Sequence, residues 1–194
     1  MEKPEYRTIA EMIGMFDEPN RTACRRLYAE NRERFRQARG STHNHQAWGG
    51  GYHDHVEDAM NYAILFFRAD ALTGRRMPFT LADALLAVFL HDLEKPWRFE
   101  RDEHGAWVNT GLMKDKRSRA NFRWAKMADY GIALTPTLVN AITYAEGEGD
   151  DYRSDRRVSN ELAGFVHVCD HYSARVRHDF PSDMDPWSRR VDLP

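Results

Sequence analysis

The sequence predicts an all-α protein, a compact helical bundle with one short β-hairpin. Two observations favour this fold. Apolar residues between about Tyr52 and Leu72 recur with the helical period. Residues that cap helices, together with Gly and Pro, stand at the ends of the apolar stretches, as Thr80 does before the strongly apolar segment 81–90.

The N-terminal part predicts two helices followed by a loop. Residues 8–16 form a short amphipathic helix that Asp17-Glu-Pro-Asn20 interrupts. Asn20 is a favourable N-cap for a long, arginine-rich helix that reaches about Gln37. A glycine-bracketed loop, 39–51, then leads into the helix that begins near Tyr52.

The remaining elements follow the apolar helix that ends at His91-Asp92. Alternating residues on both sides of Asp102-Glu-His-Gly105 predict a short hairpin that contains Trp97 and Phe99 on one side. We expect further helices at about 115–130, 136–145 and 159–177, an acidic loop at 146–151 and an irregular tail from Pro181. No repeat or linker divides the chain, so we expect a single domain over residues 1–194 with its core at about 40–180.

Composition narrows the function classes. With 42% hydrophobic residues, 30% charged residues and a net charge of -2, the chain offers no global charge for binding extended nucleic acid or a membrane. Two distant cysteines, Cys24 and Cys169, make no disulfide framework. We expect no signal peptide, no membrane span and a cytoplasmic protein. Its surface aromatics are compatible with a homodimer.

His91-Asp92 is the most informative pair, because burying charged groups is costly unless they are paired or bind a metal. Two further polar residues share stripes with apolar neighbours: His55 with Val56 and Met60, and Asp170 with Val166 and Cys169. Histidine and aspartate are both good ligands for divalent metals. We therefore predict one divalent ion (Mn, Co, Ni, Fe, Zn or Mg) at a site on three helices, formed by His55, His91, Asp92 and Asp170.

Each ligand also has a purely structural interpretation. A single histidine on an apolar face is usually a hydrogen-bonded core residue. Asp92 could be half-exposed at a helix end, and Asp170 could pair with Arg175 or Arg156. The metal hypothesis explains four buried polar groups at once, which separate explanations do not.

The order of these residues resembles the HD-domain superfamily of metal-dependent phosphohydrolases over residues 40–180. Gly50-Gly-Tyr-His-Asp-His55-Val is similar to the family's first-ligand segment, and His91-Asp92-Leu-Glu-Lys95-Pro is similar to its HD signature, with Glu94 where Gly is frequent. Val168-Cys-Asp170-His-Tyr-Ser-Ala-Arg175 resembles the terminal Asp motif. The resemblance implies a helical HD-type fold and hydrolysis of a phosphate ester or anhydride by a metal-activated water.

The same comparison suggests roles for neighbouring residues. Asp92 could also orient or deprotonate the water, and Lys95 could reach a phosphate or simply be a solvated helix-end lysine. Glu94 could act as acid or base, or be exposed. Glu146, in the acidic stretch where many relatives have a histidine, could be a general acid or only part of a solvated loop.

Residues near the first ligand are candidates for contacting the substrate. His45, Gln46 and Trp48 could bind a base or sugar by hydrogen bonding and stacking, although Trp48 is more simply explained by packing in the core. Arg21, Arg25 and Arg26 could contact phosphate, but an exposed basic helix face is the simpler explanation.

The leading hypothesis is a hydrolase for a small nucleotide, a nucleoside or deoxynucleoside mono- or triphosphate. An HD-type phosphodiesterase or nuclease is the main alternative, and the near-neutral charge disfavours it. An HD-type di-iron oxygenase ranks lower, because between Asp92 and Asp170 only His104 and His167 could serve a second metal. A non-catalytic nucleotide-binding protein is the remaining alternative.

Overall fold

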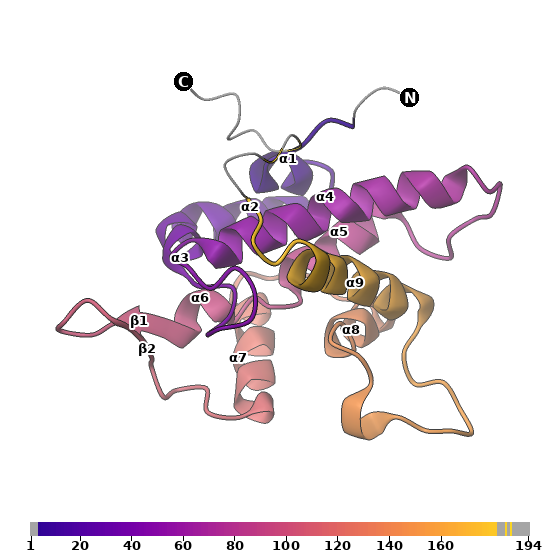
Figure 1. Cartoon of the computed structure of the whole chain (residues 1–194). Coiled ribbons are helices and arrows are strands. Elements are labelled where there is room, and N and C mark those ends of the chain that lie inside the picture. Colours follow the sequence, from indigo (N-terminus) through magenta and orange to yellow (C-terminus); the bar gives the residue numbers. More distant parts are fainter. Residues whose placement is uncertain (1–3, 182–184, 186, 188–194) are drawn as a thin grey trace.

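The structure is a computed structural model, and it describes residues 4–181, 185 and 187. These residues are mostly helical with one short antiparallel hairpin, so the predicted all-α class with a hairpin is confirmed (Figure 1). In chain order, the elements are α1 (Ile9–Ile13), α2 (Asn20–Glu30), α3 (Arg32–Gln37), α4 (Gly51–Ala71), α5 (Leu81–Leu90), α6 (Lys95–Arg98), β1 (Phe99–Arg101), β2 (Trp107–Asn109), α7 (Lys116–Asp129), α8 (Pro136–Thr143), the 3₁₀ turn η1 (Gly149–Asp151), α9 (Glu161–His171) and the π-helical turn η2 (Tyr172–Val176).

The N-terminal helices differ from the prediction in two ways. Asn20 does not cap α2: its amide bonds both the N–H and the carbonyl of Ala133, which ties α2 to the loop before α8. The expected long helix is interrupted at Asn31, where α2 ends and α3 begins. The Asn31 side chain donates to the Leu27 carbonyl and to the Tyr130 hydroxyl, and such side-chain bonds compete with helical backbone bonding.

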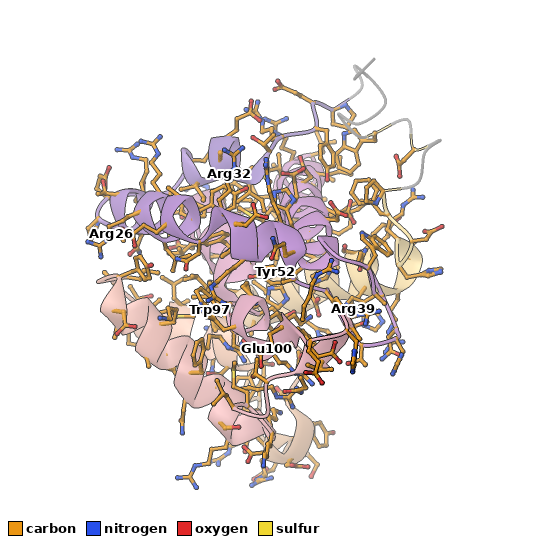
Figure 2. The ribbon with its side chains drawn as sticks, turned by 90° about the vertical axis from the view of Figure 1, so that its left-hand side faces the viewer. Arg26, Arg32, Arg39, Tyr52, Trp97 and Glu100 are labelled. Carbon is orange, nitrogen blue, oxygen red and sulfur yellow. The ribbon has the colours of Figure 1, made fainter. Side chains whose placement is uncertain are left out.

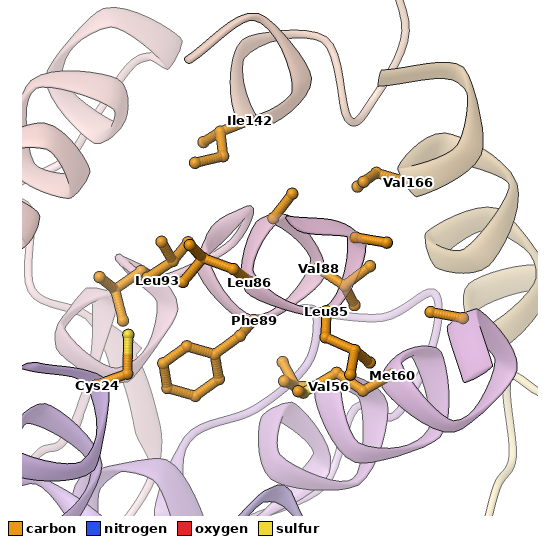
Figure 3. Close-up of a cluster of buried hydrophobic side chains, with 14 of the residues drawn as sticks. Cys24, Val56, Met60, Leu85, Leu86, Val88, Phe89, Leu93, Ile142 and Val166 are labelled. Atoms are coloured by element: carbon orange, nitrogen blue, oxygen red, sulfur yellow. The ribbon is translucent and has the colours of Figure 1, made fainter. Parts of the chain in front are cut away.

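Helix α5 is the centre of the fold. From Ala84 to Leu90 every residue is buried, as expected of a helix that is apolar on all sides. Thr80 caps it through a capping box with Asp83, which confirms the predicted start. Figure 3 shows its side chains meeting Val56 and Met60 of α4, Ile142 of α8 and Val166 of α9.

A four-residue turn, 91–94, follows α5 and leads into α6 and the hairpin. Strands β1 and β2 pair antiparallel, with Phe99 opposite Asn109. The hairpin is therefore confirmed, but Trp97 lies in α6 rather than in a strand because the chain continues as a helical turn through Arg98.

The C-terminal helices complete the bundle. The predicted helix at 159–177 begins later, after the N-cap Asn160, and changes to a π-helical turn from Tyr172. Helix α9 packs against α4, α5 and α8, so α4, α5 and α9 meet one another pairwise.

A single cluster of buried apolar side chains extends from Ile9 in α1 to Cys169 in α9. The N-terminal helices therefore contribute to the same core as the rest of the described chain. Among the described residues, no helix combines the length and apolar character that crossing a membrane requires.

Candidate metal centre

The four predicted metal ligands meet where α4, α5 and α9 come together. His55 lies in the second turn of α4, His91 caps the C-terminal end of α5, Asp92 follows it, and Asp170 lies near the end of α9. Both imidazoles are fully buried, and the two carboxylates are largely buried. One potential ligand atom from each residue lies within 4.8 Å of all the others.

The distances show a compact arrangement around the Asp170 carboxylate. Its Oδ1 atom is 3.0 Å from His55 Nε2 and 3.4 Å from His91 Nε2. The Oδ2 atom of Asp92 is 3.2 Å from His91 Nε2. Asp170 therefore contacts the two histidines, and not Arg175 or Arg156 as the alternative interpretation had it.

Each imidazole is held by its other ring nitrogen. His91 Nδ1 donates to the Val88 carbonyl over 2.7 Å, so in the neutral ring Nε2 carries the lone pair that faces the centre. His55 Nδ1 lies 3.2 Å from the Ser173 hydroxyl. Such contacts orient the rings that bind metals in proteins.

The donor set fits a divalent metal ion. The Nε2 atoms of His55 and His91 are buried and have no hydrogen-bond partner among the described residues, although carboxylate oxygens lie close by. A shared metal ion requires such an arrangement, in which imidazole nitrogens and carboxylate oxygens point toward one place without bonding to each other. Two nitrogen donors and two carboxylates suit transition metals, so this group could hold one.

Burial and neighbouring charge set the ionisation of the ligands. Burial lowers the pKa of His55 more than Asp170 raises it. Burial also opposes a charge on His91, but Asp92 and Asp170 outweigh it and raise the pKa of His91 well above its ordinary value. Burial alone would raise the pKa values of both carboxylates, but neighbouring groups lower them below the ordinary value. For Asp170 these groups are the two histidines, and for Asp92 the main one is Lys95. Without a metal, the two ionised carboxylates are therefore balanced by positive charge on His91 and Lys95, and a bound cation would take the place of the proton on His91.

Lys95 and Glu94, two predicted catalytic residues, lie beside the ligands and are buried. Lys95 Nζ is 2.6 Å from Asp92 Oδ2, and this carboxylate raises the pKa of Lys95 in spite of burial. Burial and Asp92 raise the pKa of Glu94, which Arg123 of α7 offsets only in part. Neither residue is a solvated helix-end side chain.

Glu94 also opens onto a small basic cleft of about 100 Å³ between α7 and α8. The cleft brings Glu94 together with the exposed Glu146, which follows α8. Three cations of α7 line it: Lys116, Arg119 and Arg123.

The loop before α4 gives its three candidate residues different positions. His45 lies against His55, with ring centroids 5.1 Å apart, and its pKa is lowered to about 3 by burial and by the nearby Lys95. The Gln46 amide nitrogen is buried and donates to the Arg177 carbonyl, so it locks the loop onto the end of η2. Trp48 donates to Asp54 at the start of α4 and is half-buried, in line with a packing role. Of the three, His45 is nearest the centre.

Neither of the two histidines considered for a second metal joins the centre. His104 lies in the exposed hairpin turn, and His167 Nδ1 bonds the Ala145 carbonyl. Within the described part of the chain, the four ligands named above form the one group able to hold an ion.

Sequence reasoning missed three residues that support the centre. Arg123 donates to the His91 carbonyl and lies 3.2 Å from Glu94. Ser173 contacts His55, and the buried Asp58 lies on the same side of α4. Ser173 follows Asp170 by three residues, a spacing that places both on one helical face and could have indicated it. No signal in the sequence pointed to Arg123, because its role depends on how α7 docks.

Comparison with known proteins places the chain in no family. No family model matches it, and neither a curated protein nor a solved structure shows significant similarity to it.

Proposed function

We propose that the protein is a metal-dependent phosphohydrolase of the HD type that acts on a small nucleotide. The observation that carries the proposal is the convergence of His55, His91, Asp92 and Asp170 on one buried point, with the Lys95 ammonium at its edge. This combination of two imidazoles, two carboxylates and a buried cation suits a reaction at a phosphoryl group.

A divalent ion bound by the four ligands would polarise a phosphoryl oxygen and lower the pKa of water. The chain's own residues supply the rest of the chemistry. Asp92 accepts from Lys95 and is held in its ionised form, which suits a group that binds the ion and orients water by accepting a hydrogen bond. Lys95 keeps its proton and can neutralise charge on a phosphate.

Glu94 has the properties of a proton donor to a leaving group. Burial and Asp92 raise its pKa, so it keeps a proton at higher pH than an exposed glutamate. Arg119, Arg123 and Lys116 in the adjoining cleft add positive charge where further phosphate oxygens of a substrate would be held. Lys95 and this cleft support a phosphate-bearing substrate.

A panel of nucleoside mono-, di- and triphosphates, incubated with metal-free protein and then Mn²⁺, Co²⁺, Ni²⁺ or Mg²⁺, tests the proposal. We expect release of phosphate, pyrophosphate or triphosphate with at least one metal. Glu100→Gln, a change to an exposed carboxylate on β1, should leave the rate unchanged, whereas Asp170→Asn should remove it. No release from any nucleotide would refute the proposal.

Two other outcomes would select a different function. Salt-sensitive cleavage of single-stranded DNA in place of nucleotide hydrolysis would favour a nuclease. Tight nucleotide binding without turnover, after metal has been added, would favour a non-catalytic binding protein.

A further inference from the structure

A second cavity lies on the opposite face of α4 from the metal centre. It is open to solvent on one side and has a volume of about 550 Å³, which is within the range of pockets that bind small molecules. Helices α1, α2, α3 and the first turns of α4 supply its walls. We call it the arginine cavity, because Arg25, Arg32 and Arg36 line it.

The three arginines of this cavity have no partner for their charge. Searching the described residues, we find no hydrogen bond or ion pair made by the guanidinium groups of Arg25, Arg32 and Arg36. All three are exposed at the cavity rim, so they remain charged and accessible.

Neighbouring arginines on the same helix behave differently. Arg21 pairs with Glu18 over 2.8 Å, and Arg26 stacks on the Tyr130 ring and donates to the Tyr130 carbonyl. In Figure 2, which faces α2 and α3, Arg26 and Arg32 are labelled at separate points of this surface. On α2, the two arginines outside the cavity therefore find partners within the protein, whereas Arg25, which lines the cavity, does not.

Hydrogen bonds hold the side chains of the inner cavity wall in place. Tyr28 and His53 hydrogen-bond over 3.0 Å, and Glu57 accepts from the Ile9 backbone N–H, which fixes its carboxylate against α1. Ile13 and two alanines, Ala10 and Ala29, supply apolar wall. Three guanidinium groups face one carboxylate here, so the net charge of the lining is positive.

These features define the chemistry of a ligand. Guanidinium groups bind phosphate oxygens with paired, charge-assisted hydrogen bonds. The apolar wall suits a ligand that carries an uncharged portion besides its phosphate. We propose that the arginine cavity binds a phosphorylated small molecule, with its phosphate at Arg25, Arg32 and Arg36 and its apolar portion against Ile13. This binding requires no metal and is independent of the proposed hydrolysis.

Calorimetric titration with 5′-AMP and with adenosine tests the proposal in protein kept metal-free by a chelator. We expect 5′-AMP to bind and adenosine to bind at least about tenfold more weakly, because adenosine lacks the group that the arginines recognise. Arg32→Ala/Arg36→Ala should weaken the binding of 5′-AMP by about tenfold or more. Because both side chains are exposed and unpaired, this variant should keep the thermal midpoint of the parent protein.

Two control variants locate the bound probe. Arg34→Ala removes an exposed arginine of α3 outside the cavity and should leave the affinity unchanged. Lys116→Ala/Arg119→Ala removes charge from the cleft beside Glu94 and should also have no effect. The proposal is overturned if 5′-AMP does not bind, if adenosine binds equally well, or if either control weakens binding as much as the cavity variant.

Discussion

The metal centre and the arginine cavity lie on opposite faces of α4 and treat charge in opposite ways. At the centre, every ionised group is buried beside an opposite charge, as Lys95 is beside Asp92. At the cavity, Arg32 and Arg36 are exposed and unpaired. Because an unpaired charge is tolerated in water but not in the interior, each arrangement suits its depth.

Helix α4 separates the two regions by its periodicity. His53 and Glu57, four residues apart, face the arginine cavity. His55 and Asp58, three residues apart, face Ser173 and α9 instead. Polar side chains on the buried face of α4 contact one another, so we expect one substitution there to disturb several groups. A substitution at the cavity rim should affect only the side chain that is changed.

The largest expected effect is the loss of catalysis on Asp92→Ala. This change removes one proposed ligand and the group that faces Lys95, so we expect turnover to fall to the level of a no-enzyme control. Titration with Mn²⁺ followed by calorimetry should show weakened metal binding. Retained activity with normal metal affinity would contradict the assignment of the centre.

The same substitution should also destabilise the metal-free protein. Without Asp92, the buried ammonium of Lys95 loses its nearest counter-charge, which typically costs about 3–5 kcal/mol of unfolding free energy. Adding Lys95→Met removes the orphaned charge and should restore part of this loss. Urea denaturation of the two single variants and the double variant measures the coupling.

A substitution at the cavity rim provides the comparison for these stability measurements. Arg32→Ala should change the unfolding free energy by no more than about 0.5 kcal/mol, because no described residue partners its charge. If Arg32→Ala lowered the unfolding free energy as much as Asp92→Ala, the contrast between the buried, paired charges of the metal centre and the exposed, unpaired charges of the cavity rim would be wrong.

Asp58 offers a smaller effect that depends on pH. Neither carboxylate oxygen has a well-formed hydrogen bond within the described structure, and burial raises the pKa of Asp58 to about 7, with the Ser173 hydroxyl offsetting only part of the shift. Between about pH 4 and pH 7, the folded protein therefore holds a proton that the unfolded chain has released. Stability must then fall as pH rises through this window.

Asp58→Asn removes this dependence because the amide stays neutral. We expect the metal-free variant to match the parent near pH 4 and to exceed it near pH 8 by up to about 4 kcal/mol. Thermal unfolding across this range checks the expectation. A constant difference between the two proteins at all pH values would show that Asp58 ionises normally.

The convergence of the four candidate ligands could be predicted because each lies within a helix or directly after one. His55 and Asp170 share apolar stripes, so helical phase directed them inward, and His91-Asp92 directly follows an apolar run that had to be buried. The hairpin and the Thr80 cap were predicted correctly for the same reason, since both depend on neighbouring residues.

The remaining features depend on contacts distant in sequence. The break at Asn31 needs Tyr130, and the role of Asn20 needs Ala133, each about a hundred residues away. Gln46 has a side chain that could bind a ligand, yet its amide holds the loop against η2. Arg123 reaches Glu94 only because α7 docks beside the turn after α5.

Among the changes expected to disturb the fold, the smallest effect concerns Gly51, where the loop meets α4. A Cβ atom at this position would lie 1.8 Å from the Gln46 carbonyl oxygen, so Gly51→Ala must displace the loop that carries His45. We expect a loss of about 1–3 kcal/mol in unfolding free energy, as for other overpacked sites. Gly164→Ala is the matched control, because nothing lies within 4 Å of its added Cβ and alanine favours the interior of α9.

Since the loop packs on the side of the metal centre, Gly51→Ala should lower nucleotide turnover while leaving 5′-AMP binding at the arginine cavity unchanged. Equal losses at both sites would mean that the two faces of α4 do not respond independently.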